Sequence, residues 1–137
     1  MADDILLAKA AIIERCLKRI SEDYRGHEAA FAVEFMRQDA IILNLQRACE
    51  AAIDGAMHLV RIGSLGLPQD SRDAFSLLEQ AKRLSPDLAT RMRAMVGFRN
   101  VAVHDYGTLN LDIVRAIVEH RLDDLRAFAR VLIQQAG

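Results

Sequence analysis

Residues Phe35 to Ile62 have the sequence FMRQDAIILNLQRACEAAIDGAMHLVRI, in which apolar side chains recur every three or four positions. That spacing lines one face of an α-helix. The apolar positions are Met36, Ile42, Leu43, Leu45, Cys49, Ile53, Met57 and Val60. The pattern is too long and too apolar on one side for a surface helix, so it predicts a helix in the core of the protein.

Helical spacing also precedes this segment. The stretch DDILLAKAAIIERCLKRI predicts a first helix, which Asp3 or Asp4 can cap. Its apolar face contains Ile5, Ile12, Ile13, Cys16, Leu17 and Ile20. Gly26 ends the turn that follows, so the first helix is separate from the long one.

Three more helices are predicted after the long one. The stretch GSLGLPQDS, residues 63–71, indicates a loop, and Asp70 or Ser71 can cap the short helix that follows it. Ser85 and Pro86 are typical of the start of a fourth helix, which extends towards Val103. Beyond Gly107, residues 110–132 predict one last helix, which opens with Asn110 and Asp112.

These elements amount to four long helices and one short helix. Short connections make sequential helices antiparallel neighbours, so we expect an all-α, antiparallel up-and-down bundle with residues 1–137 as a single domain. The composition agrees, with 52% hydrophobic residues, only 5% aromatic residues and no tryptophan. Such a profile favours helices over strands.

Charge and apolar patterning limit the classes of function. A net charge of -1 gives no overall attraction to nucleic acid or to an anionic membrane. Lys9 and Glu14 interrupt the first apolar run, which is therefore neither a signal peptide nor a membrane span. We expect a cytoplasmic protein with no membrane partner. Residues 80–99 are an exception to the neutral balance, because they hold five basic residues and one acidic residue.

The cysteines and most of the histidines carry no metal signature. Cys16 and Cys49 lie far apart among apolar helical positions, which predicts two buried free thiols. His27, His58 and His120 share no ligand spacing with one another or with the cysteines. We therefore assign no metal and no cofactor.

The stretch FRNVAVHDY, Phe98 to Tyr106, places an arginine, a histidine and a tyrosine among valines. A guanidinium matches the geometry of phosphate, and an imidazole with a pKa of about 6.5 exchanges protons near neutral pH. Metal-free cleavage of an RNA phosphodiester needs both kinds of group. The histidine moves a proton at the ribose or at the leaving oxygen, and the arginine stabilises the charged transition state.

Helical spacing alone does not establish such a site. Arg99 and His104 would be about 140° apart around an ideal helix. They converge only if the helix ends or tightens near His104, or if two chains each contribute to one cleft. Judged singly, a histidine at a helix end, a surface arginine and a half-buried tyrosine are more often structural than catalytic.

A family resemblance favours the catalytic interpretation. MVGFRNVAVHDY resembles the signature of HepT-like toxins of the HEPN superfamily, in which an arginine is followed after four residues by a histidine and after one more by a tyrosine. Arg99, His104 and Tyr106 match it, with Asn100 after the arginine. RQDAIILNLQRACEAAIDGA, the GLP of residues 66–68, DAFSLL and LDIVRAIVEHRLDDLRAF are similar to family segments in the same order.

The resemblance implies a homodimeric bundle whose paired motifs line a shared cleft. It also implies a metal-independent ribonuclease that is the toxin half of a toxin–antitoxin module. The antitoxin partner resembles a minimal nucleotidyltransferase that transfers AMP from ATP to the motif tyrosine. Carried onto this sequence, Arg99 and His104 are the catalytic pair for an RNA substrate, and Tyr106 is the modified residue.

Three further residues are candidates for supporting roles. Asn100 either orients the His104 ring or caps the helix. Asp39 and Asn44 are candidates for lining the same cleft, although surface positions or a buried polar network are the more ordinary alternative. The alternative function is a non-enzymatic module that binds a nucleotidyltransferase partner or a nucleotide through these residues and breaks no bond.

Overall fold

The computed structural model describes residues 2–137, and this part of the chain contains helices, turns and loops but no strand. The long helices are α1 (Asp4–Tyr24), α3 (Phe35–Ile62), α5 (Pro86–His104) and α7 (Leu122–Ala136). The shorter ones are α2 (Glu28–Phe31), α4 (Ser71–Gln80), the 3₁₀ helix η1 (Tyr106–Thr108) and α6 (Leu111–His120). The predicted all-α class is confirmed.

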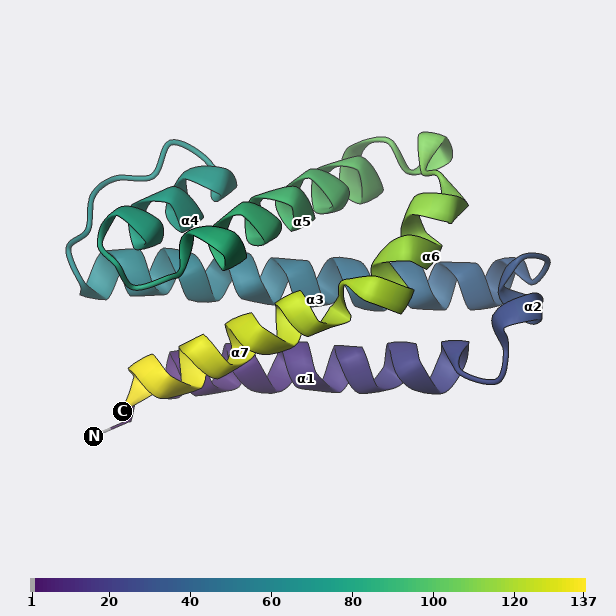
Figure 1. Cartoon of the computed structure of the whole chain (residues 1–137), viewed down its shortest axis with the longest axis horizontal. Helices are drawn as coiled ribbons and strands as arrows, with labels where there is room; N and C mark the ends of the chain where they lie inside the picture. Colours follow the sequence, from purple (N-terminus) through teal and green to yellow (C-terminus); the bar gives the residue numbers. More distant parts are fainter. Residues whose placement is uncertain (1) are drawn as a thin grey trace.

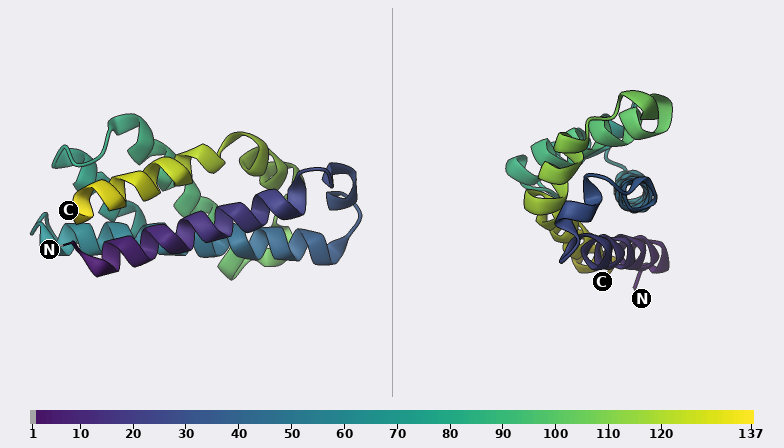
Figure 2. Two further views of the ribbon diagram at one scale, coloured as in Figure 1. Left: turned by 90° about the horizontal axis from the view of Figure 1, so that it is seen from below. Right: turned by 90° about the vertical axis from the view of Figure 1, so that its right-hand side faces the viewer.

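The long helices run alternately in opposite directions, as Figure 1 shows, so that both ends of the chain lie at the same end of the bundle. α3 is central and packs against α1, α4, α5 and α7. Seen end-on, α1 and α5 lie on either side of α3 (Figure 2, right). The up-and-down arrangement predicted from the short connections is therefore confirmed.

Four of the helices, α1, α4, α5 and α6, begin where a capping side chain satisfies their first amide groups. Asp3 Oδ1 accepts from the backbone N–H groups of Ile5 and Leu6 at 2.9 and 3.0 Å. Ser85 Oγ accepts from the N–H of Leu88 at 3.2 Å, with Pro86 as the first helical residue. Asp70 and Asn110 cap α4 and α6 in the same way. Such caps each stabilise a helix by about 1 kcal/mol.

The core is apolar and closely packed. Its largest fully buried side chains include Phe31, Phe75, Phe128, Leu6, Ile13 and Leu17. Both cysteines are buried free thiols, as predicted, and burial raises the pKa of each. α3 and α7 approach closely at Gly55, where an added Cβ would lie 2.7 Å from Leu132 Cδ1.

A polar contact ties the start of α1 to α3. His58 Nε2 lies 2.8 Å from Asp3 Oδ2, and Arg61 Nη2 lies 2.9 Å from His58 Nδ1. The arginine can only donate, so Nδ1 is the acceptor and Nε2–H donates to Asp3. The buried imidazole therefore joins the cap of α1 to the last turns of α3.

The last helix differs from the prediction. Residues 110–132 form two helices, not one, and the break is at Arg121 with φ −124° and ψ 0°. α7 packs along α1, whereas Arg115 of α6 reaches the Tyr24 hydroxyl at 2.9 Å and the Glu28 carbonyl oxygen at 3.3 Å. α6 thus contacts the last residue of α1 and the first residue of α2, and neither glycine nor proline marks the break in the sequence.

One face of α3 remains open in the single chain. Met36, Asp39, Leu43, Arg47 and Asp54 are exposed, and their spacing puts them on one side of the helix. The prediction that Met36 and Leu43 belong to the buried stripe is wrong, since 86% and 43% of their surfaces are exposed. Met36 and Leu43 share their side of α3 with the polar residues Asp39, Arg47 and Asp54, so an apolar residue type alone did not distinguish the packed side from the open one.

No helix in residues 2–137 combines the length and the apolar content that crossing a membrane would require.

Candidate active site

The motif lies at the end of α5 and in the short turn after it. α5 remains helical through His104, and the N–H of Asp105 still donates to the carbonyl of Val101 at 2.8 Å. Arg99 and His104 therefore keep the separation of about 140° that an unbroken helix imposes. Arg99 and His104 could converge through an early end of the helix or across two chains, and the helix does not end early in this chain.

Arg99 is held between α3, α4 and α5. Its Nη2 donates to Ser71 Oγ at 3.0 Å, at the start of α4. Its Nε is buried and has no hydrogen-bond partner within residues 2–137. The guanidinium is also close enough to Cys49 to counter in part the burial that raises the pKa of that thiol to about 12. The sequence indicates Ser71 only as a helix cap, and no local pattern predicts its contact with Arg99.

His104 is the last residue of α5, and its side chain is exposed. No hydrogen bond joins its ring to Arg99 or to Asn100 in the described chain. His104 is thus free to meet a molecule that approaches from solvent.

Tyr106 follows in η1 and turns towards α3. Its hydroxyl donates a hydrogen bond to Asp39 Oδ1, and 45% of the residue's surface is exposed. Partial burial, followed by the hydrogen bond and the negative charge of Asp39, raises the pKa of the phenol to about 12. The sequence makes Asp39 a candidate for the same cleft as the motif but does not predict its contact with Tyr106, because 67 residues separate the two.

The other two candidates differ from Asp39 in their environment. Asn44 is buried, and its Nδ2 donates to the carbonyl of Ala40 at 3.0 Å. Its Oδ1 is buried without a partner within residues 2–137. Asn100 is half-buried on α5, and neither an orienting nor a capping hydrogen bond of its side chain is present in the described part of the chain.

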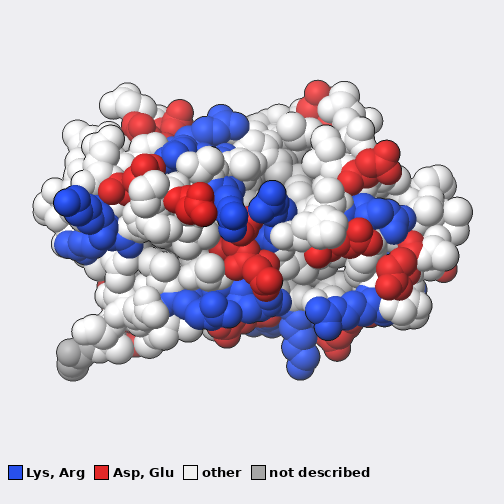
Figure 3. All heavy atoms as spheres, viewed as in Figure 1, with Lys and Arg blue, Asp and Glu red and all other residues white. Residues whose placement is uncertain are grey.

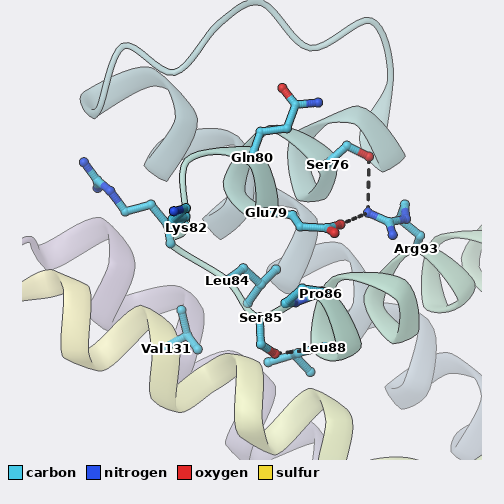
Figure 4. A pocket seen from close by; sticks show the side chains of 11 residues that line it. Ser76, Glu79, Gln80, Lys82, Leu84, Ser85, Pro86, Leu88, Arg93 and Val131 are labelled. Carbon is cyan, nitrogen blue, oxygen red and sulfur yellow. Dashed lines mark hydrogen bonds and ion pairs between the residues drawn. The ribbon is translucent and has the colours of Figure 1, made fainter.

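The basic residues of the 80–99 segment are spread over the fold and do not gather at the motif. Arg91 pairs with Asp124 at 3.2 Å. Arg93 pairs with Glu79 at 2.9 Å and donates to Ser76, beside a cavity of about 960 Å³ between α4, α5 and α7 (Figure 4). On the face in Figure 3, basic and acidic side chains alternate. Arg99 is therefore the one basic residue of segment 80–99 that belongs to the motif with His104 and Tyr106.

A second cavity, of about 860 Å³, lies between α5, α6 and the start of α7. Its apolar lining includes Met95, Phe98, Val101, Leu109 and Ile113. Arg99, His104 and Tyr106 line neither cavity. His104 and Tyr106 are exposed at the surface of the single chain, whereas Arg99 is half-buried. Among residues 2–137 no cluster of three metal-ligating side chains is present.

Comparisons with known proteins agree over almost the whole chain. A model of the family Ribonuclease HepT-like matches residues 13–132. The mRNA nuclease HepT of Shewanella oneidensis is 49% identical over 130 residues, which is 95% of this chain and 97% of that protein.

Two solved structures share the fold at TM-scores of 0.90. One is a toxin–antitoxin with AMP-PNP, 48% identical and covering 95% of this chain and 98% of its own. The other is a tri-AMPylated Shewanella oneidensis HEPN toxin in complex with MNT antitoxin, 49% identical and covering 95% and 97%.

Proposed function

The chain belongs to the Ribonuclease HepT-like family, and on this basis we propose that it is the toxin of a toxin–antitoxin pair and cleaves RNA without a metal ion. The observation that carries the proposal is the pair Arg99 and His104 on the last turns of α5, with an exposed imidazole at the helix end. The Shewanella relative is an mRNA nuclease, which supports RNA as the substrate class.

The chemistry follows from the two side chains. An imidazole takes the proton of the ribose 2′-hydroxyl as its oxygen attacks phosphorus, or gives a proton to the 5′-oxygen as the P–O5′ bond breaks. Arg99 stabilises the negative charge that accumulates on the phosphorane-like transition state. The products are a 2′,3′-cyclic phosphate and a free 5′-hydroxyl.

We further propose that two copies of the chain form one cleft. Arg99 and His104 leave α5 on different sides, and His104 is exposed in the single chain. A second copy packed against the exposed face of α3 would enclose both motifs. Protein interiors exclude water, and a covered site strengthens each electrostatic contact with the phosphate.

Tyr106 is proposed as the point of control. A relative of this chain is tri-AMPylated and bound to MNT antitoxin. A phenol that is 45% exposed and two residues from His104 is accessible to a modifying enzyme. AMP on this oxygen would block the approach to His104 and offer Arg99 an anion that competes with RNA.

The test is RNA cleavage by the purified protein in EDTA between about pH 5 and 8, the range in which a histidine changes charge. Arg99→Ala is expected to lower the rate about 100- to 1,000-fold, as loss of a transition-state donor does. His104→Ala is expected to lower it about 100- to 10,000-fold, the usual contribution of an acid–base group. Products are identified by their 2′,3′-cyclic phosphate ends.

Matched controls are Arg130→Ala on α7 and His27→Ala at the start of α2, because both side chains are exposed and lie in other elements. Both controls should cleave RNA at the wild-type rate. Full activity in Arg99→Ala and His104→Ala would exclude these residues as the catalytic pair. Binding of RNA without cleavage by the wild type would favour a non-enzymatic module.

The protein is proposed to act in the cytoplasm, where an mRNA substrate would be present. Residues 1–137 are proposed to form one domain.

A further inference from the structure

The Tyr106 hydroxyl has one protein partner in the described chain, the carboxylate of Asp39. We propose that Asp39 accepts the proton of Tyr106 when the tyrosine oxygen attacks the α-phosphate of a nucleoside triphosphate. The inference rests on the proposed function, in which Tyr106 is the AMPylated residue. It assigns part of the chemistry of neutralisation to the toxin and not to the antitoxin.

The contact is built by two elements far apart in the sequence. Asp39 lies on the open face of α3, and Tyr106 is brought to it by η1, whose tight turn follows the end of α5. Within residues 2–137 Asp39 takes part in no ion pair, so no lysine or arginine of the described chain neutralises its carboxylate. Both side chains are exposed, which leaves the reacting oxygen accessible from solvent.

The second tyrosine shows how this contact differs from a structural one. Tyr24 is 5% exposed, and its hydroxyl donates to Glu119 while Arg115 donates to it at 2.9 Å. That oxygen is enclosed, and an arginine balances the acid beside it. At Tyr106 the oxygen is open and the acid is unbalanced, which is the arrangement that a nucleophile with its own base requires.

A proton acceptor is needed because the phenol of Tyr106 is held in its neutral form. Its pKa is raised to about 12, so only a small fraction is phenolate at neutral pH. A neutral phenol is a weak nucleophile, and a base that takes the proton during attack removes that barrier. Carboxylates are ionised at neutral pH and can accept this proton.

The step balances in atoms and charge. The tyrosine oxygen forms a bond to the α-phosphorus, the bond from that phosphorus to the bridging oxygen breaks, and pyrophosphate leaves. The phenolic proton passes to Asp39, which then releases it to water. The product is a phosphodiester between Tyr106 and AMP, and it can no longer donate to the carboxylate.

The experiment compares wild type with Asp39→Asn, which keeps the size of the side chain but cannot take the proton. Each protein is mixed with the cognate MNT antitoxin, Mg²⁺ and ATP at pH 6 to 9, and AMP addition is followed by intact mass. At pH 7 we expect Asp39→Asn to react about 100-fold or more slowly, the usual contribution of a general base. The ratio of the two rates should shrink as pH rises, because hydroxide replaces the missing base.

Taking the ratio cancels the antitoxin's own pH dependence, which is common to both toxins. Asp54→Asn is the matched control, since it removes another exposed carboxylate from the same face of α3. This variant should react like wild type. Equal rates for Asp39→Asn and wild type would overturn the inference, and so would a slow rate whose ratio to wild type does not change with pH.

Tyr106→Phe separates failure of the inference from failure of the proposed function. If Tyr106→Phe abolishes AMP addition and Asp39→Asn has no effect, Tyr106 remains the modified residue and only the role of Asp39 is lost. If Tyr106→Phe still gains AMP, the modification site itself is wrong. Circular dichroism of each variant checks that helix content is retained.

Discussion

At the scale of single residues, the pKa values of both tyrosines are raised, and the two leading causes are of the same kind. Burial is the largest cause for both, followed by a hydrogen bond to a carboxylate, which is Glu119 for Tyr24 and Asp39 for Tyr106. A raised folded pKa means that the native state favours the protonated phenol. The resulting stabilisation is complete below pH 10 and is lost as pH rises through the folded pKa.

A tyrosine titration checks this assignment. In a Tyr24→Phe background Tyr106 is the one remaining tyrosine, because the chain has two and no tryptophan. Absorbance at the tyrosinate band should report a pKa of about 12 for Tyr106. Asp39→Asn should lower this pKa but leave it above 10, since burial is the larger cause. An unchanged pKa in Asp39→Asn would contradict the hydrogen bond.

At the scale of elements, the sequence predicts what local chemistry determines. The bounds of α3 and the start of α5 at Pro86 are found as predicted, because apolar spacing and capping residues act within a few positions. The break at Arg121 and the open side of α3 depend on which helices pack against each other. Neighbouring residues in the sequence do not determine this packing. The Asp39–Tyr106 contact was missed for the same reason.

The packing of α3 on α7 gives an element-scale prediction. A Cβ at Gly55 would lie 2.7 and 2.9 Å from the two methyl carbons of Leu132, which is fully buried. Gly55→Val is therefore expected to lower the free energy of unfolding by about 1–3 kcal/mol, the usual cost of overpacking. Urea denaturation followed by circular dichroism measures this change.

Leu132→Ala provides the internal test. It opens space where the introduced valine side chain would clash, so the double variant should lose less stability than the sum of the two single variants. Gly107→Val is the control, because a Cβ there meets nothing within 4 Å. Strict additivity of the two substitutions would show that Gly55 and Leu132 are not in contact.

At the scale of the whole molecule, the fold leaves its motif and one long helix face uncovered. Phe35 and Leu43 lie one helical turn on either side of Asp39 and are 78% and 43% exposed. Val103, beside His104 on α5, is 42% exposed. Apolar side chains exposed around a polar site are typical of an interface. The proposed two-chain cleft would bury them and bring the two motifs together.

A two-chain cleft predicts that two inactive variants restore each other. Arg99→Ala and His104→Ala are co-expressed with different affinity tags, and mixed dimers are isolated through both tags. Such a dimer retains one Arg99 and one His104, contributed by different protomers. If both motifs face one cleft, the mixed dimer should cleave RNA in EDTA while each variant alone is inactive.

An inactive mixed dimer would contradict the two-chain cleft. A site complete within one chain would leave the mixed dimer as inactive as its parents, because no protomer in it has both residues. A mixed dimer carrying the Arg99→Ala and His104→Ala substitutions in the same protomer, beside a wild-type partner, gives the matched reference. If only the dimer with the doubly substituted protomer cleaves RNA, the Arg99–His104 pair lies within a single chain. If both kinds of mixed dimer cleave RNA, an active pair can form within one protomer or between the two.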